Sequence, residues 1–108
     1  MTDPADAASP SPEHRPPEGA IVRVLPIVNS KGLHARAAAQ FVLLVEKFDA
    51  DVTVTRGHET VGGTSIMGLL MLSAAPGTSI TVTAAGAQAA EVMVALEALV
   101  AGRFGEGE

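Results

Sequence analysis

The sequence contains no cysteine, tryptophan or tyrosine, and only three of its 108 residues are phenylalanine. Without cysteine the chain can form neither a disulfide bond nor a thiolate zinc site, and we expect neither a metal nor another cofactor. The chain has no apolar run long enough to cross a membrane, and its first residues lack a basic segment followed by an apolar one. We therefore expect no membrane insertion and a cytoplasmic location.

The net charge of −5 is concentrated at the two ends of the chain. Residues 1–20 hold four acidic side chains and one basic one, and residues 105–108 hold two acidic ones. Between them, six acidic side chains balance six basic ones. This neutral central part, with so few aromatic side chains, lacks both the basic surface and the stacking platforms that nucleic-acid binding usually needs. We exclude nucleic acid as a partner.

Proline marks a boundary near residue 20. Five of the seven prolines lie in residues 1–20, mixed with alanine, serine and aspartate. Such a segment cannot bury enough apolar surface to offset its ordering entropy, so we predict a disordered acidic extension there. Residues 21–104 are long enough for one small domain with a single core. We expect the protein to be a monomer. Residues 105–108 are predicted to form a flexible tail.

Hydrophobic spacing predicts secondary-structure elements in the order βαββαβα. Strands are predicted at residues 21–28, 51–56, 59–61 and 79–83, and helices at residues 35–47, 65–72 and 87–100. Because Pro26 lacks a backbone donor, the first strand is expected at a sheet edge. Strands that alternate apolar with polar side chains favour a four-stranded antiparallel sheet with helices on one face. The predicted fold is an α+β open-faced β-sandwich.

His34 is the residue best placed for chemistry, because it stands at or just before the first residue of the first predicted helix. The first turn of a helix offers unpaired N–H groups, here including those of Ala35 and Ala37, and the positive end of the helix dipole. That field, reinforced by Arg36 and Lys31, disfavours a protonated imidazole and leaves a neutral nitrogen that is a nucleophile. The same groups would receive the oxygens of a phosphoryl group bound to the ring.

The same residues allow other interpretations. His34 can be an ordinary polar residue near a helix start and Arg36 a solvated charge, because a motif this short also arises by chance. A small phosphohydrolase of the acylphosphatase kind would use Arg36 and the helix N–H groups to hold phosphate around an attacking water. A third interpretation is a regulatory binding module that signals only through Ser65, at the start of the second predicted helix. No Ser/His/Asp or paired-carboxylate arrangement supports a self-contained hydrolase.

Three segments of the chain resemble the HPr family of phosphocarrier proteins. They are NSKGLHARAAAQFVLLV at residues 29–45, GTSIMGLLML at 63–72 and PGTSI at 76–80, and the resemblance extends over residues 21–101. It implies the HPr fold and a phosphocarrier of the phosphotransferase system rather than an independent enzyme. It also implies that enzyme I phosphorylates His34 using phosphoenolpyruvate, that Arg36 assists, and that the group moves on to an EIIA domain.

The chain departs from the family pattern at several positions. Many HPr sequences have proline where this chain has Ala37, which keeps its N–H group. Leu43, Leu44 and Glu46 replace polar or basic residues and weaken the basic rim that would steer acidic partners. With the acidic extension, these features resemble the nitrogen-related or regulatory branch more than the sugar-transport branch.

The second predicted helix carries a further candidate site. Ser65 is suited to cap this helix, and capping alone would explain it. In regulatory HPr proteins the serine of the SIMG segment is phosphorylated by HPr kinase/phosphorylase, so the resemblance implies the same for Ser65. The core-facing residues are expected to be Leu69 and Leu72. The residues expected at the surface, as a docking patch for protein partners, are Ile66, Met67 and Leu70. A fully buried helix is the alternative.

Overall fold

A four-stranded antiparallel sheet forms one layer of the computed structural model, which describes residues 19–106. The strands are β1 (Ile21–Pro26), β2 (Asp51–Arg56), β3 (Glu59–Gly62) and β4 (Ser79–Ala85), in the spatial order β1-β4-β2-β3. The prediction that the first strand lies at a sheet edge is confirmed, because β1 pairs only with β4 among the described strands. The predicted disordered extension lies, except for its last two residues, outside the described residues.

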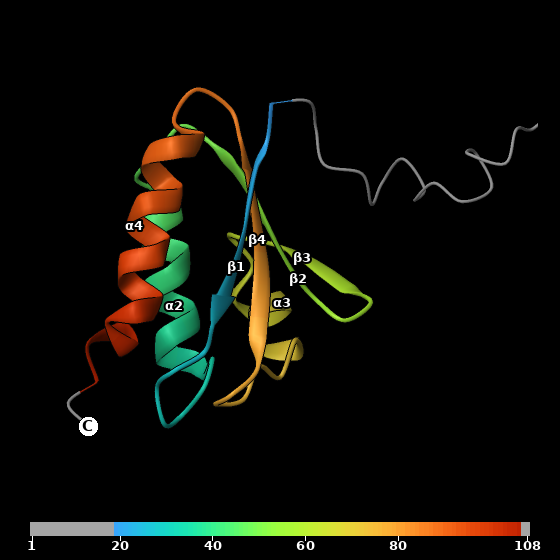
Figure 1. The fold of residues 1–108 in the computed structure, drawn as a ribbon, viewed down its shortest axis with the longest axis vertical. Helices are drawn as coiled ribbons and strands as arrows, with labels where there is room; N and C mark the ends of the chain where they lie inside the picture. The colour runs from blue at the N-terminus through green and yellow to red at the C-terminus, as the bar shows by residue number, and fades with distance from the viewer. Residues whose placement is uncertain (1–18, 107–108) are drawn as a thin grey trace, which may run out of the picture.

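Helices cover one face of this sheet, as predicted (Figure 1). They are α2 (Ala35–Val45), α3 (Ile66–Met71) and α4 (Ala89–Ala101), and a short 3₁₀ segment, η2 (Arg103–Gly105), follows α4. The observed order is the predicted βαββαβα, with η2 added at the end. Among the helices of residues 19–106, none is both long and apolar enough to cross a bilayer.

The core lies between the helices and the inner face of the sheet. Strand β4 alternates strictly, so Ile80, Val82 and Ala84 are buried while their neighbours are not. The buried face of α2 includes Ala38, Phe41, Val42 and Val45, which recur at helical spacing. Burial of such side chains is the main favourable term in folding, at about 25 cal/mol per Å² of apolar area.

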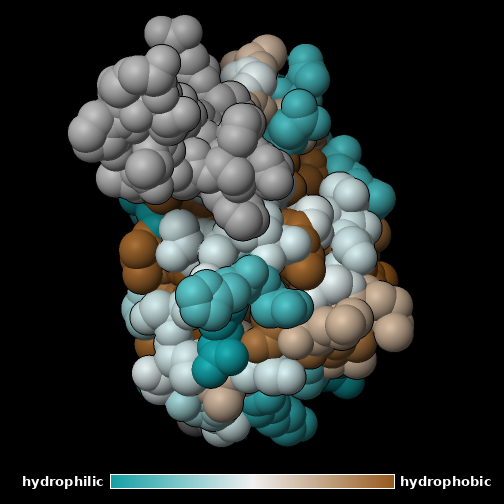
Figure 2. All heavy atoms as spheres, turned by 90° about the vertical axis from the view of Figure 1, so that its right-hand side faces the viewer, coloured by the Kyte–Doolittle hydropathy of each residue, from teal (hydrophilic) through white to brown (hydrophobic). Residues whose placement is uncertain are grey.

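The other face of the sheet is open and weakly polar. The residues that alternate outward on β2 and β4 are mainly threonines, and none of these is fully buried: Thr53, Thr55, Thr81 and Thr83. Figure 2 shows this side of the molecule, where nearly white surface lies between smaller apolar and strongly polar areas.

Candidate functional site

The loop before α2 is fixed by a close approach of two backbone segments. Gly32 has φ +66°, and a Cβ atom there would lie 2.6 Å from the carbonyl oxygen of Ala74. The next residue, Leu33, is buried and donates its N–H to the same oxygen at 2.9 Å. Only glycine can adopt this left-handed backbone conformation and also fit so close to the Ala74 carbonyl. The loop thereby presents the following residue, His34, at a defined place.

His34 is the N-cap of α2, as the sequence predicted for its position. Its backbone is extended (φ −84°, ψ −177°), and its carbonyl accepts the first helical hydrogen bond, from the N–H of Ala38 at 2.8 Å. Its Nδ1 atom accepts the N–H of Arg36 at 3.3 Å. The side chain is 27% exposed, so the ring is neither sealed in the core nor free in solvent. One ring nitrogen therefore points at the helix N-terminus.

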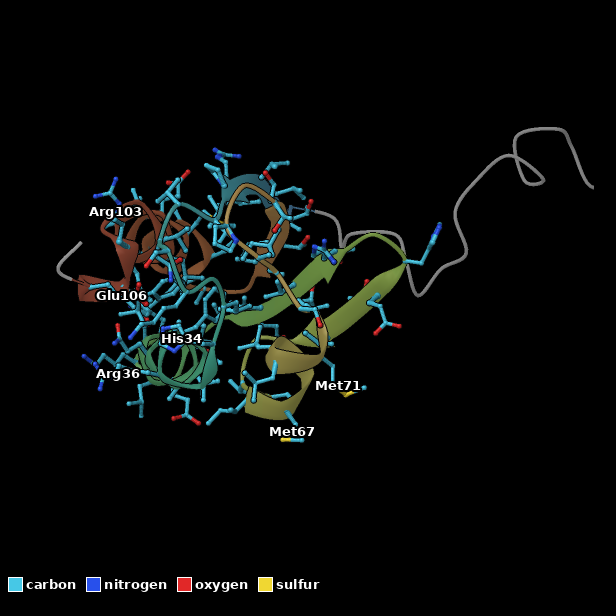
Figure 3. The ribbon with its side chains drawn as sticks, turned by 90° about the horizontal axis from the view of Figure 1, so that it is seen from below. His34, Arg36, Met67, Met71, Arg103 and Glu106 are labelled. Atoms are coloured by element: carbon cyan, nitrogen blue, oxygen red, sulfur yellow. The ribbon has the colours of Figure 1, made fainter. Side chains whose placement is uncertain are left out.

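The other ring nitrogen contacts Glu106, a residue that no local sequence pattern marks. Nε2 of His34 lies 2.6 Å from Oε2 of Glu106, which also accepts a hydrogen bond from Nδ2 of Asn29 at 3.0 Å. Asn29 is fully buried and donates to the carbonyl of Gly32 at 2.8 Å as well. The prediction of a flexible tail at residues 105–108 is wrong for Glu106, because its side chain packs against the site and is 12% exposed. Figure 3 shows Glu106 and His34 side by side.

The predicted basic side chains lie around the ring without touching it. Lys31 is exposed and lines, with Leu33 and His34, a cleft of about 220 Å³ that opens beside the imidazole. The Arg36 side chain is exposed and, within the described residues, forms no ion pair (Figure 3). Together with Glu106, these groups give the imidazole a mixed electrostatic environment rather than the purely positive one that the sequence suggested.

The first turn of α2 supplies backbone donors at this point. Ala35 is exposed, whereas the Ala37 side chain is fully buried, so only its main chain can serve a ligand at the surface. The N–H groups of a first helical turn have no acceptor inside the helix, and the dipole there is positive. The arrangement can therefore present a neutral imidazole nitrogen beside a site that favours an anion.

Helix α3 lies next to α2 and exposes apolar side chains. Ser65 caps it, with its hydroxyl oxygen accepting the N–H of Gly68 at 3.0 Å. Met67 is 69% exposed, and Ile66 is 40% exposed, as expected. The core-facing pair is confirmed, because Leu69 and Leu72 are buried.

One residue of the expected patch differs from the prediction. Leu70 is only partly exposed and packs against the core, whereas Met71, which lies outside the predicted patch, is 67% exposed. Each residue advances about 100° around a helix. Met67 and Met71 lie two positions on either side of the buried Leu69 and so point away from the core (Figure 3). We define the α3 patch as Ile66, Met67 and Met71.

Comparisons with known proteins agree with this geometry. The model of the family described as "PTS HPr component phosphorylation site" matches residues 21–102. "Phosphocarrier protein HPr" of Neisseria meningitidis is 50% identical over 82 residues, which cover 76% of this chain and 92% of that protein. "Phosphocarrier protein NPr" of Shewanella violacea is 39% identical over 84 residues, covering 78% and 92% respectively. The crystal structure of HPr-C-His from Thermoanaerobacter tengcongensis superposes with a TM-score of 0.78 at 34% identity, covering 82% of this chain and 99% of that one.

Proposed function

Since this chain belongs to the HPr family of phosphocarrier proteins of the phosphotransferase system, we propose that His34 is the residue that carries the phosphoryl group. In this proposal, phospho-enzyme I donates the group, and His34 passes it to an EIIA-type protein. The protein acts as a relay component and not as an independent catalyst. The comparisons include both HPr and NPr proteins, so the choice between the sugar-transport and nitrogen-related branches stays a prediction.

The position of Nδ1 of His34 is the observation that carries the proposal. A ring nitrogen that accepts an N–H bond holds no proton, so in the neutral ring the proton is on Nε2 and the lone pair on Nδ1. Nδ1 accepts the Arg36 N–H, and the side chain is accessible to another protein. The lone pair of Nδ1 can attack phosphorus while the bond from phosphorus to the donor breaks and its electron pair stays with the donor.

The helix start would then hold the product. A phosphoryl group on Nδ1 lies at the N-terminus of α2, where backbone N–H groups of Ala35, Arg36 and Ala37 can donate to its oxygens. The exposed guanidinium of Arg36 can add charge-assisted hydrogen bonds, which are roughly twice as strong as neutral ones. Lys31, at the rim of the adjoining cleft, contributes further positive charge.

The α3 patch is the proposed docking surface for enzyme I and EIIA-type proteins. Apolar side chains that gather in a patch at a surface can mark a site of protein interaction. Methionine is well suited to bind more than one partner, because its flexible thioether adapts to different surfaces. The patch lies on the helix next to α2, so a partner seated on it can reach His34.

Ser65 is proposed as a regulatory site for HPr kinase/phosphorylase. The side chain is exposed and stands directly before the α3 patch. A phosphate there would keep an oxygen near the helix N-terminus but would add negative charge beside the docking surface. We therefore expect phosphorylation of Ser65 to slow transfer to His34 by electrostatics rather than by unfolding α3.

Labelling with enzyme I tests the proposal. The protein is incubated with enzyme I and ³²P-phosphoenolpyruvate, and the expected result is one acid-labile label per chain that is absent in His34→Ala. His58→Ala is the matched control, because His58 lies exposed in the turn between β2 and β3, and it should label like the parent. Phosphorus NMR should place the group on Nδ1.

The two rival functions give different results in the same assay. A small phosphohydrolase would release inorganic phosphate without a stable phosphoprotein. A module that signals through Ser65 alone would take an acid-stable label only from ATP and a kinase. Equal labelling of His34→Ala and the parent would refute the proposed role of His34.

A further inference from the structure

The segment after α4 folds back onto the site through an unusual run of backbone angles. Arg103, Phe104 and Gly105 have φ values of +59°, +53° and +75°. A non-glycine residue in this region is strained, so it persists only where the surroundings hold it. Here the Phe104 side chain, 3% exposed, is buried in the core. Phe104 thus anchors residues 103–105, and the residue that follows them, Glu106, reaches His34.

Glu106 is held where the anchored segment ends. Its Oε2 atom accepts from Asn29 at 3.0 Å and lies 2.6 Å from Nε2 of His34. Both side chains of the glutamate–histidine pair are largely removed from solvent, with exposures of 12% and 27%. Charge-assisted hydrogen bonds of this length are strong, and a low local dielectric strengthens them further. The contact therefore constrains the orientation of the ring.

We propose that Glu106 is a positioning residue that fixes the tautomer and orientation of His34 and balances the charge of the phosphorylated ring. This inference rests on the proposed function of His34. An ionised carboxylate can only accept hydrogen bonds, so it favours the tautomer that carries its hydrogen on Nε2. In that tautomer the lone pair of Nδ1 points at the start of α2. The same logic operates where a carboxylate orients a catalytic or metal-binding histidine.

The charge balance of the transfer step gives Glu106 a second task. When Nδ1 forms its bond to phosphorus, the bond to the donor breaks and the donor keeps that electron pair. Nε2 retains its proton, so the ring gains a positive charge. The carboxylate of Glu106 is the opposite charge nearest to that ring in the described structure. Onward transfer reverses these changes, and the ring returns to its neutral Nε2–H form.

The tautomer of His34 can be measured without any phosphoryl donor. We compare ¹⁵N chemical shifts of the His34 ring in the parent, in Glu106→Gln and in Glu59→Gln, at an alkaline pH where the ring is neutral. Glu106→Gln keeps the side-chain shape but replaces a pure acceptor by an amide that can also donate to Nε2. Glu59 lies exposed in β3 and is the matched control for the charge change. The parent and Glu59→Gln should show the Nε2–H tautomer, and Glu106→Gln should show a mixture or the Nδ1–H form.

The rate of phosphorylation by enzyme I is the second readout. Glu106→Gln should be slower than the parent by about 10- to 100-fold, the range for losing a carboxylate that orients a functional histidine. Glu106→Asp, which keeps the charge but shortens the reach, should recover part of the rate, and Glu59→Gln should match the parent. A second variant that ends at Gly105 should reproduce the loss. A parent-like tautomer in Glu106→Gln, or a rate within twofold of the parent, overturns the proposal.

The two proposals fail in different ways. If His34→Ala still takes the acid-labile label, the proposed function fails while the tautomer measurement remains valid for the free protein. If His34 is labelled but the ring in Glu106→Gln is unchanged, the phosphocarrier role stands and the positioning role of Glu106 is refuted.

Discussion

Replacing Gly32 by alanine tests how the loop before His34 is built. The new Cβ would lie 2.6 Å from the Ala74 carbonyl oxygen and 3.2 Å from the Ala75 Cα atom, both of which belong to backbone that cannot rotate away. The left-handed backbone, φ +66°, adds about 1–2 kcal/mol for any residue with a Cβ. Overpacking a close contact adds a further 1–3 kcal/mol or so. We expect Gly32→Ala to lower the free energy of unfolding by about 2–5 kcal/mol.

Gly57 provides the matched control for this substitution. Its φ is +62°, close to that of Gly32, but a Cβ atom there would meet no heavy atom within 4 Å. Gly57→Ala should therefore lower the free energy of unfolding by only about 1–2 kcal/mol. Urea denaturation of both variants measures the difference, which isolates the contact with Ala74. If the two losses agree within about 0.5 kcal/mol, the contact does not restrain the loop and the reasoning is refuted.

Three further substitutions probe the surroundings of the site. Phe104→Ala should lower the free energy of unfolding by about 3–5 kcal/mol in urea denaturation, and a loss below about 1 kcal/mol would contradict its role as an anchor. Met67→Gln should change that free energy by less than about 0.5 kcal/mol yet slow labelling by enzyme I, whereas parent-like labelling would argue against the α3 patch. Ser65→Asp should slow labelling of His34 at low salt and less so at high salt, and equal rates at low salt would refute electrostatic regulation.

The fold and one half of the site could be predicted from local sequence. The spacing of Phe41 and Val45 identifies the buried face of α2, and the alternation of β4 identifies its inner face. His34 could be placed at the start of α2 because capping depends on neighbours in the chain. These features are local, so periodicity and turn chemistry suffice to find them.

The other half of the site could not be predicted, because it depends on contacts between distant residues. Glu106 meets His34 from 72 positions away, and its neighbours in sequence are glycines that resemble a flexible tail. The one available signal was Phe104, a lone large apolar residue in that segment, which is where an anchor would be expected. Whether Leu70 or Met71 belongs to the α3 patch depends on how α3 is rotated against the core. Its short, wholly apolar sequence does not define that rotation.

In the proposed phosphoprotein, the two halves of the site would act on the phosphoryl group in opposite senses. The N-terminus of α2 and Arg36 would attract the phosphoryl oxygens, whereas Glu106 carries the same sign of charge and would repel them. Because Glu106 contacts Nε2, it lies across the ring from a group on Nδ1, and the cationic ring stands between the two negative charges. The attraction of the carboxylate for the nearer ring would offset its repulsion of the more distant phosphoryl group, since Coulomb energy falls with distance. We therefore expect the proposed site to hold the group without binding it so tightly that a partner could not remove it.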